Sequence, residues 1–263
     1  LQSEWRGRIS HWIRTLKDDL YEPLGEISWE AFPTMEYLAF EEAQKATFQP
    51  VEPGFTWGRL WEYCWFKGVV TLPKEAEGQR IVMNLNPGGE STLFVNGKGF
   101  GTYRADWVSE PHHFMEDNVL TACGKAGERF DVLMETYSGH YYPDAGGCAT
   151  GPVLPGAFQD PAQEGKRSTL GKCTYGIWNE DAYQLYMDVE TLNKLLQTMD
   201  TSSLRAAKIA KALQQFTLIA DFEQPREGRI QSYRAAREAL RPVMEAKNGS
   251  TMPVFYAVGN AHL

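Results

Sequence analysis

Short apolar runs separated by turn residues occupy the chain from about Thr56 to Thr136, and this pattern constrains the fold more than any other feature. Runs of this length bounded by Gly, Pro, Asn or Asp are typical of β-strands. The clearest turn is Asn96-Gly97, because Asn-Gly readily adopts the positive φ angles that a two-residue hairpin requires. Closely spaced strands with such turns predict two packed antiparallel sheets. The expected strands are Trp61–Val70, Arg80–Leu85, Ser91–Val95 and Phe130–Thr136.

Helical patterns flank this region on both sides. The residues up to Leu20 place apolar side chains at helical spacing, which predicts an amphipathic helix docked on its own domain. Residues Tyr21 to Pro53 are rich in Pro, Gly and Glu without a sustained period, which predicts a long surface connection. Later in the chain we expect three further helices, with a cap at Thr201 or Ser202 opening the second and a kink at Pro242 in the third.

These patterns divide the chain into four parts. Residues 1–54 are the first helix and the connection, 55–180 the β-sandwich, 181–250 a helical segment, and 251–263 a continuous apolar run. That last run, Pro253–Leu263, has the character of a buried parallel strand whose C-terminal end opens on a site. A strand of this kind needs neighbours, so we expect a chain that stops at the start of a further domain.

The amino-acid composition limits which binding partners and which cellular compartment are expected. The net charge is −8 and the Lys and Arg residues are scattered, so no nucleic acid partner is expected. No leader-like segment and no apolar run of roughly 20 residues is found, which predicts a cytoplasmic protein without a membrane partner. Widely separated cysteines without a CxxC pair favour free thiols in a reducing compartment; they are Cys64, Cys123, Cys148 and Cys173.

Residues Ser138 to Thr174 form a long stretch dense in Gly and Pro, a length at which loops usually carry function. Within it, His140, Tyr141, Tyr142 and Asp144 combine aromatic faces with polar groups, which suits a sugar site or the lining of an active site. The alternative is a loop packed on its own sandwich or against a catalytic domain, and the sequence leaves both interpretations open.

The remaining histidine and tryptophan groups are expected to be structural. His112 and His113 are adjacent, so on a strand they point to opposite faces, which favours a hydrogen-bonded or solvated pair over a shared metal. Trp57, Trp61 and Trp65 recur every four residues. In a strand Trp61 and Trp65 share one face, and packing in the core is the expected role of all three.

The final residues, Val258-Gly259-Asn260-Ala261-His262-Leu263, resemble the opening of the catalytic domain of glycoside hydrolase family 38 α-mannosidases. There a strand ends in Gly and leads to His-x-Asp, and the Asp would fall here at position number 264. The resemblance implies that His262 is one of four ligands of a divalent metal, usually zinc. His and Asp two residues apart on a strand project to the same side, which suits joint ligation. The alternative is that His262 is an ordinary polar residue at a strand end.

Longer segments resemble the N-terminal domain of the cytosolic and vacuolar branch of this family. Trp61–Pro73 resembles the Trp-x-x-x-Trp-Phe strand of that domain, and Gly89–Gly97 resembles its hairpin. Tyr183–Leu196 resembles the helix that precedes the barrel. The resemblance implies a jelly-roll sandwich of the galactose-binding-like type, then helices, then the first strand of a (β/α) barrel. It also implies a parent enzyme that hydrolyses terminal α-mannosides with retention, through two carboxyl groups roughly 5 Å apart. No position here matches the family nucleophile, so this fragment is expected to be inactive and to hold no metal alone.

The resulting hypothesis is the non-catalytic N-terminal accessory region of an α-mannosidase. Its partners would be its own catalytic domain and, through the full-length enzyme, mannose-containing oligosaccharides, with a homo-oligomer as a further option. Two alternatives stay open, a free-standing carbohydrate-binding module and an oligomerisation scaffold. The three helices and the terminal apolar run favour the first hypothesis, because a free-standing module does not account for them.

Overall fold

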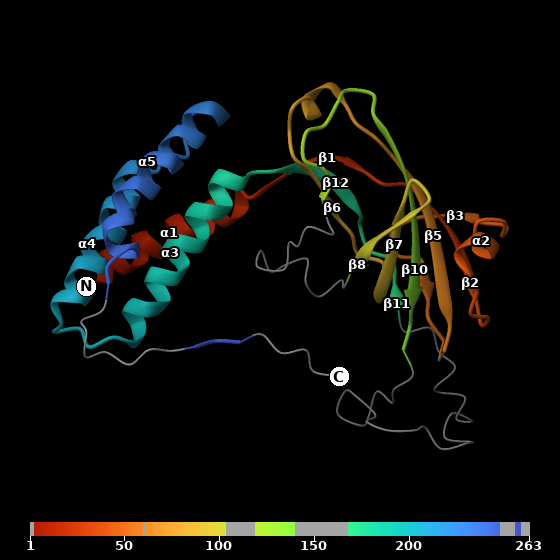
Figure 1. Ribbon diagram of the computed structural model, residues 1–263, viewed down its shortest axis with the longest axis horizontal. Helices are drawn as coiled ribbons and strands as arrows, with labels where there is room; N and C mark the ends of the chain where they lie inside the picture. The colour runs from red at the N-terminus through yellow and green to blue at the C-terminus, as the bar shows by residue number, and fades with distance from the viewer. Residues whose placement is uncertain (1–2, 60, 104–118, 140–167, 248–255, 259–263) are drawn as a thin grey trace, which may run out of the picture. The chain divides into compact units, whose positions relative to one another are not determined.

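The computed structural model (Figure 1) describes residues 3–59, 61–103, 119–139, 168–247 and 256–258. The chain divides into two compact units, one of residues 19–179 and the other of residues 1–18 with 180–263. The first is built mainly of strands and the second of helices. No described helix offers the stretch of apolar residues that a bilayer crossing demands.

The strand unit consists of antiparallel sheets. Its elements are β1 Tyr21–Glu26, β2 Trp29–Thr34, α2 Phe40–Ala43, β3 Gln49–Val51, β4 Thr56–Trp57, β5 Tyr63–Thr71, η1 Lys74–Ala76, β6 Ile81–Asn84, β7 Glu90–Val95, β8 Lys98–Tyr103, β9 Val119–Thr121, β10 Arg129–Tyr137, β11 Ser168–Thr169 and β12 Thr174–Trp178. One sheet has six strands in the order β3-β2-β5-β10-β7-β8, and another has four in the order β1-β12-β6-β9. The short strands β4 and β11 form a two-stranded pair.

Strand β5 shows why the six-stranded sheet has two different faces. Its Cys64, Phe66 and Val70 are buried, whereas Lys67 and Val69, on the opposite side of the strand, are exposed. The buried set belongs to a single apolar core that also contains side chains of the four-stranded sheet. The two sheets therefore pack face to face, as the sequence predicts. Core residues from several strands include Trp29, Phe66, Leu93, Val132, Met134, Ile81, Met83 and Ile177.

The outer face of the six-stranded sheet carries a second, smaller apolar cluster. Trp65, Leu133 and Ala43 form it, and Phe40 and Phe94 are among the side chains packed against it. Helix α2 lies on this side of the sheet, away from β1, β12 and β6 (Figure 1). The centre of β5 is consequently buried on both faces, which explains its nearly continuous apolar sequence.

The hairpin predicted at Asn96-Gly97 is confirmed. These residues join β7 to β8 with φ angles of 50° and 76°, both in the left-handed region that this turn requires. The Asn96 side chain also accepts a hydrogen bond from the Asp131 N–H at 2.9 Å, and the Asn96 N–H donates to the Asp131 carbonyl at 2.8 Å. The hairpin is thereby tied to strand β10.

The structure differs from the sequence-based expectation over Tyr21–Pro53. This segment forms β1, β2, α2 and β3 instead of a surface connection, so the sandwich begins at residue 19 and not at residue 55. The helix-breaking residues are placed where strands tolerate them. Pro23 and Gly25 flank a register shift in the edge strand β1, and Pro50 lies in the edge strand β3.

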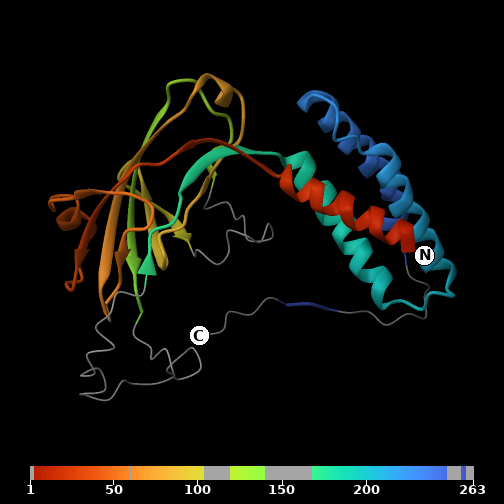
Figure 2. The ribbon, with the colours of Figure 1, turned by 180° about the vertical axis from the view of Figure 1, so that it is seen from behind.

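The helical unit confirms the helices expected from apolar spacing. They are α1 Ser3–Asp18, α3 Glu180–Thr198, α4 Leu204–Ile219 and α5 Arg226–Met244, and they lie alongside one another within their unit (Figure 2). The cap of α4 is Ser203, whose hydroxyl accepts the Ala206 N–H at 3.1 Å, and not Thr201 or Ser202. Pro242 lies in the last turn of α5.

The expected first barrel strand at residues 251–263 falls largely outside the described part of the chain. Residues 248–255 and 259–263 are not described, and Tyr256–Val258 have no regular secondary structure. Tyr256 and Val258 are 85% and 87% exposed. A buried strand leading into a barrel therefore stays a prediction.

Truncation of Phe66 tests the assignment of the two faces of β5. Phe66→Ala removes a fully buried ring and leaves a cavity, so it should lower the free energy of unfolding by about 3–5 kcal/mol. Val69→Ala is the matched control, because Val69 is 37% exposed on the opposite face, and it should cost about 1 kcal/mol or less. Urea unfolding followed by tryptophan fluorescence measures both, and equal losses would contradict the assignment.

Candidate functional site

The site residues predicted from sequence lie outside the described part of the chain. These residues are His140, Tyr141, Tyr142, Asp144 and His262, together with the pair His112 and His113. Among the described residues no group of three or more His, Cys, Asp or Glu side chains is placed to hold a metal. The roles assigned to the undescribed residues therefore stay predictions. The described cysteines Cys64, Cys123 and Cys173 form no disulfide bond with one another.

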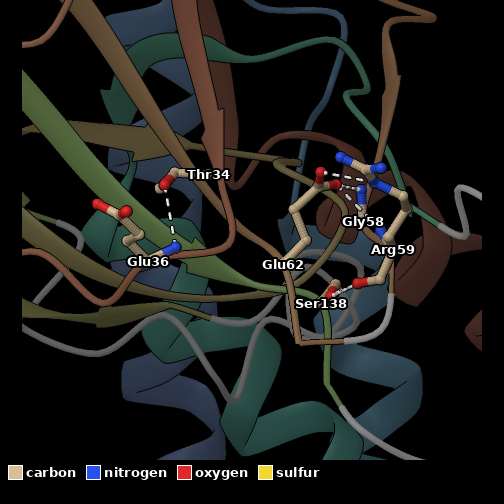
Figure 3. Close-up of polar contacts among 6 residues, drawn as sticks. All are labelled: Thr34, Glu36, Gly58, Arg59, Glu62 and Ser138. Atoms are coloured by element: carbon tan, nitrogen blue, oxygen red, sulfur yellow. Dashed lines mark hydrogen bonds and ion pairs between the residues drawn. The ribbon is translucent and has the colours of Figure 1, made fainter. Parts of the chain in front are cut away.

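The turn that leads into β5 is built around a buried carboxylate (Figure 3). Glu62 is 2% exposed, and its Oε2 accepts the N–H groups of Gly58 at 2.6 Å and Arg59 at 3.0 Å. Its Oε1 pairs with the Arg59 Nε at 3.2 Å. Charge-assisted hydrogen bonds of this kind offset the cost of burying the carboxylate. The turn is therefore held in one conformation.

Trp61 adopts the left-handed conformation within this turn, with φ of 66°, which is rare for a side chain of this size. Its N–H donates to the Gly139 carbonyl at 3.1 Å, and the Ser138 hydroxyl donates to the Arg59 carbonyl at 2.5 Å (Figure 3). The turn is thus fastened to the end of β10. Trp61 precedes β5 and is 42% exposed, so its predicted core position beside Trp65 is wrong. A left-handed residue breaks the alternation on which that prediction depended.

The other two tryptophans are buried, as predicted, but in different clusters. Trp57 belongs to the core between the sheets, where its Nε1–H donates to the Pro87 carbonyl at 2.9 Å. Trp65 belongs to the smaller cluster on the outer face. The indole groups therefore stabilise both faces of the six-stranded sheet.

Three tyrosines gather on the outer face of this sheet, where β5 begins and β10 ends. Tyr63 and Tyr137 are direct partners in the β5–β10 register, and their rings stack with centroids 4.9 Å apart. Tyr37 packs edge-on against Tyr63 at 5.8 Å and is 77% exposed. The Thr34 hydroxyl accepts the Glu36 N–H at 3.0 Å (Figure 3), which shapes the loop that carries Tyr37. We call Tyr37, Tyr63 and Tyr137 the tyrosine cluster.

A partly buried carboxyl group lies beside the tyrosine cluster. Glu135 is on the same face of β10 as Tyr137 and is the register partner of Trp65. Burial raises the pKa of Glu135, and burial followed by the nearby Glu135 charge raises the pKa of Tyr63. Among the described residues the Glu135 Oε1 accepts no hydrogen bond and the Trp65 Nε1–H donates none. Two shielded polar atoms here have unmet hydrogen-bonding capacity.

A pocket of about 400 Å³ opens on the same face, near the start of β10. Its polar groups already have neighbours, since Arg129 pairs with Asp131 at 2.9 Å and the Lys67 ammonium lies 5.7 Å from the centroid of the Phe48 ring. This makes it a weaker candidate than the tyrosine cluster. Its lining includes Phe40, Gln44, Lys67, Phe94, Arg129 and Asp131.

Sequence reasoning missed the tyrosine cluster and Glu135. Their residues belong to separate segments, and only the pairing of β5 with β10 brings them together. One signal was available, because Glu135 and Tyr137 alternate with the buried Met134 and Thr136 and must therefore share the other face. That alternation was used only to predict a strand.

Two antiparallel sheets packed around one apolar core define a β-sandwich. Residues 23–138 match the family described as "Alpha-mannosidase, jelly roll domain". The resemblance drawn from Trp61–Pro73 and Gly89–Gly97, which both lie within the matched range, is confirmed. The match begins at residue 23, which agrees with the earlier start of the sandwich in the structure.

Curated relatives extend the similarity beyond the sandwich. The chain is 22% identical to Alpha-mannosidase 2C1 of Mus musculus over 248 residues, which cover 94% of this chain and 22% of that protein. It is also 22% identical to Alpha-mannosidase 2C1 of Homo sapiens over 233 residues, which cover 89% of this chain and 21% of that protein. The chain therefore spans less than a quarter of the length of these relatives.

Among solved structures, the chain is similar to a b-glucuronidase from Ruminococcus gnavus in complex with uronic deoxynojirimycin. The TM-score is 0.36 and the sequence identity 12%, over 61% of this chain and 29% of that one. A second structure of this b-glucuronidase, in complex with D-glucuronic acid, gives a TM-score of 0.35 and 11% identity over 60% of this chain and 29% of that one. Likeness at this level is too low to carry an assignment.

Glycine and alanine at position 61 test the left-handed turn. Trp61→Gly should have a free energy of unfolding about 1 kcal/mol higher than Trp61→Ala, because glycine adopts positive φ without a Cβ penalty. At Val69, an ordinary strand position, the order should reverse, with Val69→Ala more stable than Val69→Gly. Urea unfolding of the four variants measures both differences. The same order at both positions would contradict a left-handed Trp61.

Replacement of Glu135 tests the burial of its carboxyl group. The pKa of Glu135 is higher in the folded protein than its ordinary value of 4.5. The stability that Glu135 contributes is therefore fully present below pH 4.5 and is lost as the pH rises through the pKa of the folded protein. Glu135→Gln should therefore be more stable than the wild type at about pH 7, and this gain should shrink at about pH 4. Urea unfolding at both pH values measures the gain. Thr92→Ala, at the register partner on β7, is the uncharged control, and an equal gain for Glu135→Gln at both pH values would refute the assignment.

Proposed function

We propose that this chain is the non-catalytic accessory region of an α-mannosidase, in which the sandwich supports a separate catalytic domain. The observation that carries the proposal is the match of residues 23–138 to the α-mannosidase jelly roll domain. The similarity to Alpha-mannosidase 2C1 over 94% of this chain supports it for the helical unit as well.

The chemistry of the parent enzyme belongs, in this proposal, to a (β/α) barrel that follows the helical unit. Two carboxyl groups roughly 5 Å apart, one a nucleophile and the other an acid/base, would hydrolyse terminal α-mannosides with retention. His262 would supply one ligand to a divalent metal, zinc in this proposal, which polarises sugar hydroxyls when bound. The described residues, which do not include His262, contain no group of three or more His, Cys, Asp or Glu side chains placed to hold such a metal.

The proposal also covers compartment and partners. The free thiols of Cys123 and Cys173 support a reducing compartment, and we propose the cytoplasm. Mannose-containing oligosaccharides would be substrates of the full-length enzyme. The partner of this region would be its own catalytic domain, and assembly into a homo-oligomer would be compatible with that role.

One observation favours a second function. The tyrosine cluster beside Glu135 combines aromatic rings with a carboxyl group, and a free-standing carbohydrate-binding module would use such a surface. The two functions differ in what a natural gene product can do. An accessory region is joined to a hydrolase, whereas a free-standing module binds sugar and hydrolyses nothing.

An activity assay tests the proposal. The natural full-length product should hydrolyse 4-nitrophenyl α-mannoside, release the α-anomer first, and lose activity when a chelator removes the metal. Residues 1–263 alone should show no hydrolysis, and the β-mannoside is the substrate control. The proposal fails if the full-length product leaves α-mannosides intact, or if residues 1–263 hydrolyse them unaided.

A further inference from the structure

We propose that the tyrosine cluster and Glu135 form a subsite for a carbohydrate, namely a neutral pyranoside with an apolar face and free hydroxyl groups. The site uses none of the residues His140, Tyr141, Tyr142 and Asp144 that the sequence suggested. Its existence stands on the geometry of the described residues. Only the choice of a mannoside as the first ligand rests on the proposed function.

The rings form a platform that reaches from a loop across two strands. Tyr63 and Tyr137 stack at 4.9 Å on the outer face of the sheet, and Tyr37 leans edge-on against Tyr63 at 5.8 Å. Tyr37 leaves 77% of its surface exposed, although a ring of this size is normally covered when it serves only the core. The turn at Thr34 and Glu36 holds its loop in place (Figure 3). An aromatic face fixed in this way suits the apolar side of a pyranose ring.

The polar groups beside the platform identify the chemistry of the ligand. The Glu135 Oε1 lacks a donor and the Trp65 Nε1–H lacks an acceptor among the described residues. The two side chains are direct register partners on the same face of the sheet, and Trp65 is 1% exposed. A hydroxyl group both donates and accepts, so a ligand rich in hydroxyl groups offers a partner to each of these two atoms.

Other ligand chemistries fit less well. A metal ion is disfavoured because the described residues contain no group of three His, Cys, Asp or Glu side chains. An apolar peptide segment would leave Glu135 and Trp65 unpaired and more deeply buried. A nucleic acid strand also stacks on aromatic rings, but a chain with net charge −8 repels phosphates. A neutral sugar meets the aromatic, polar and charge requirements together.

The test is a titration of residues 1–263 with methyl α-mannopyranoside, and with the α-glucoside and α-galactoside, followed by saturation-transfer NMR. Tyr37→Ala and Glu135→Gln should each raise the dissociation constant about tenfold. Tyr37→Phe keeps the ring and should bind more tightly than Tyr37→Ala. Val69→Ala, on the same face of β5, is the matched control and should bind as the wild type does. Circular dichroism confirms that each variant is folded.

The outcomes separate this inference from the proposed function. Binding of the mannoside that Tyr37→Ala and Glu135→Gln weaken supports the subsite. Binding of only the glucoside or galactoside, with the same loss in both variants, keeps the subsite but removes mannose as its ligand. The inference is overturned if no pyranoside shows saturation transfer at about 50 mM, a concentration well above a weak millimolar dissociation constant. It is overturned equally if Val69→Ala weakens binding as much as Tyr37→Ala. Hydrolysis of α-mannosides by the full-length product would stand in either case.

Discussion

The pairing of β5 with β10 is the interaction on which the rest of the sandwich depends. The two strands are matched residue for residue from Tyr63–Tyr137 to Thr71–Arg129. Because side chains alternate along a strand, this one register fixes both faces of the six-stranded sheet. A slip by one residue would turn Phe66 towards solvent if β5 moved, or would drive Glu135 into the apolar core if β10 moved.

The inner and outer faces of the six-stranded sheet have different roles. Inward side chains fill the space between two sheets and supply most of the burial that stabilises the fold. Outward side chains are mixed: near the centre of the sheet Trp65 and Leu133 are buried under helix α2, and at one end the tyrosine cluster reaches solvent. The buried Glu62 carboxylate stiffens the turn at that end, so β5 starts from a fixed point beside Tyr63. A binding surface gains precision when it is carried by rigid elements of this kind.

Much of the fold could be predicted from local patterns, and the parts that could not depend on long-range pairing. The Asn96-Gly97 turn, the strand at β10 and the helices were readable because turn chemistry and apolar period are local. The strands within Tyr21–Pro53 were not predicted because this segment contains prolines and glycines, which normally interrupt strands. These residues are tolerated here because they lie in edge strands or beside a register shift. The tyrosine cluster could not be predicted from local patterns either, because its members come together only through the register between strands. The positions predicted as sites, His262 and the residues from His140 to Asp144, stay predictions.

The central claim is that this chain is the accessory region of an α-mannosidase, with its catalytic barrel encoded further along the same gene. Reading the natural coding sequence beyond Leu263 tests it most directly. The account predicts an aspartate at position 264, which with His262 would complete the His-x-Asp pair, followed by a stretch long enough for a (β/α) barrel of roughly 250 residues. A stop codon after Leu263 would contradict it and leave a free-standing sugar-binding protein in its place.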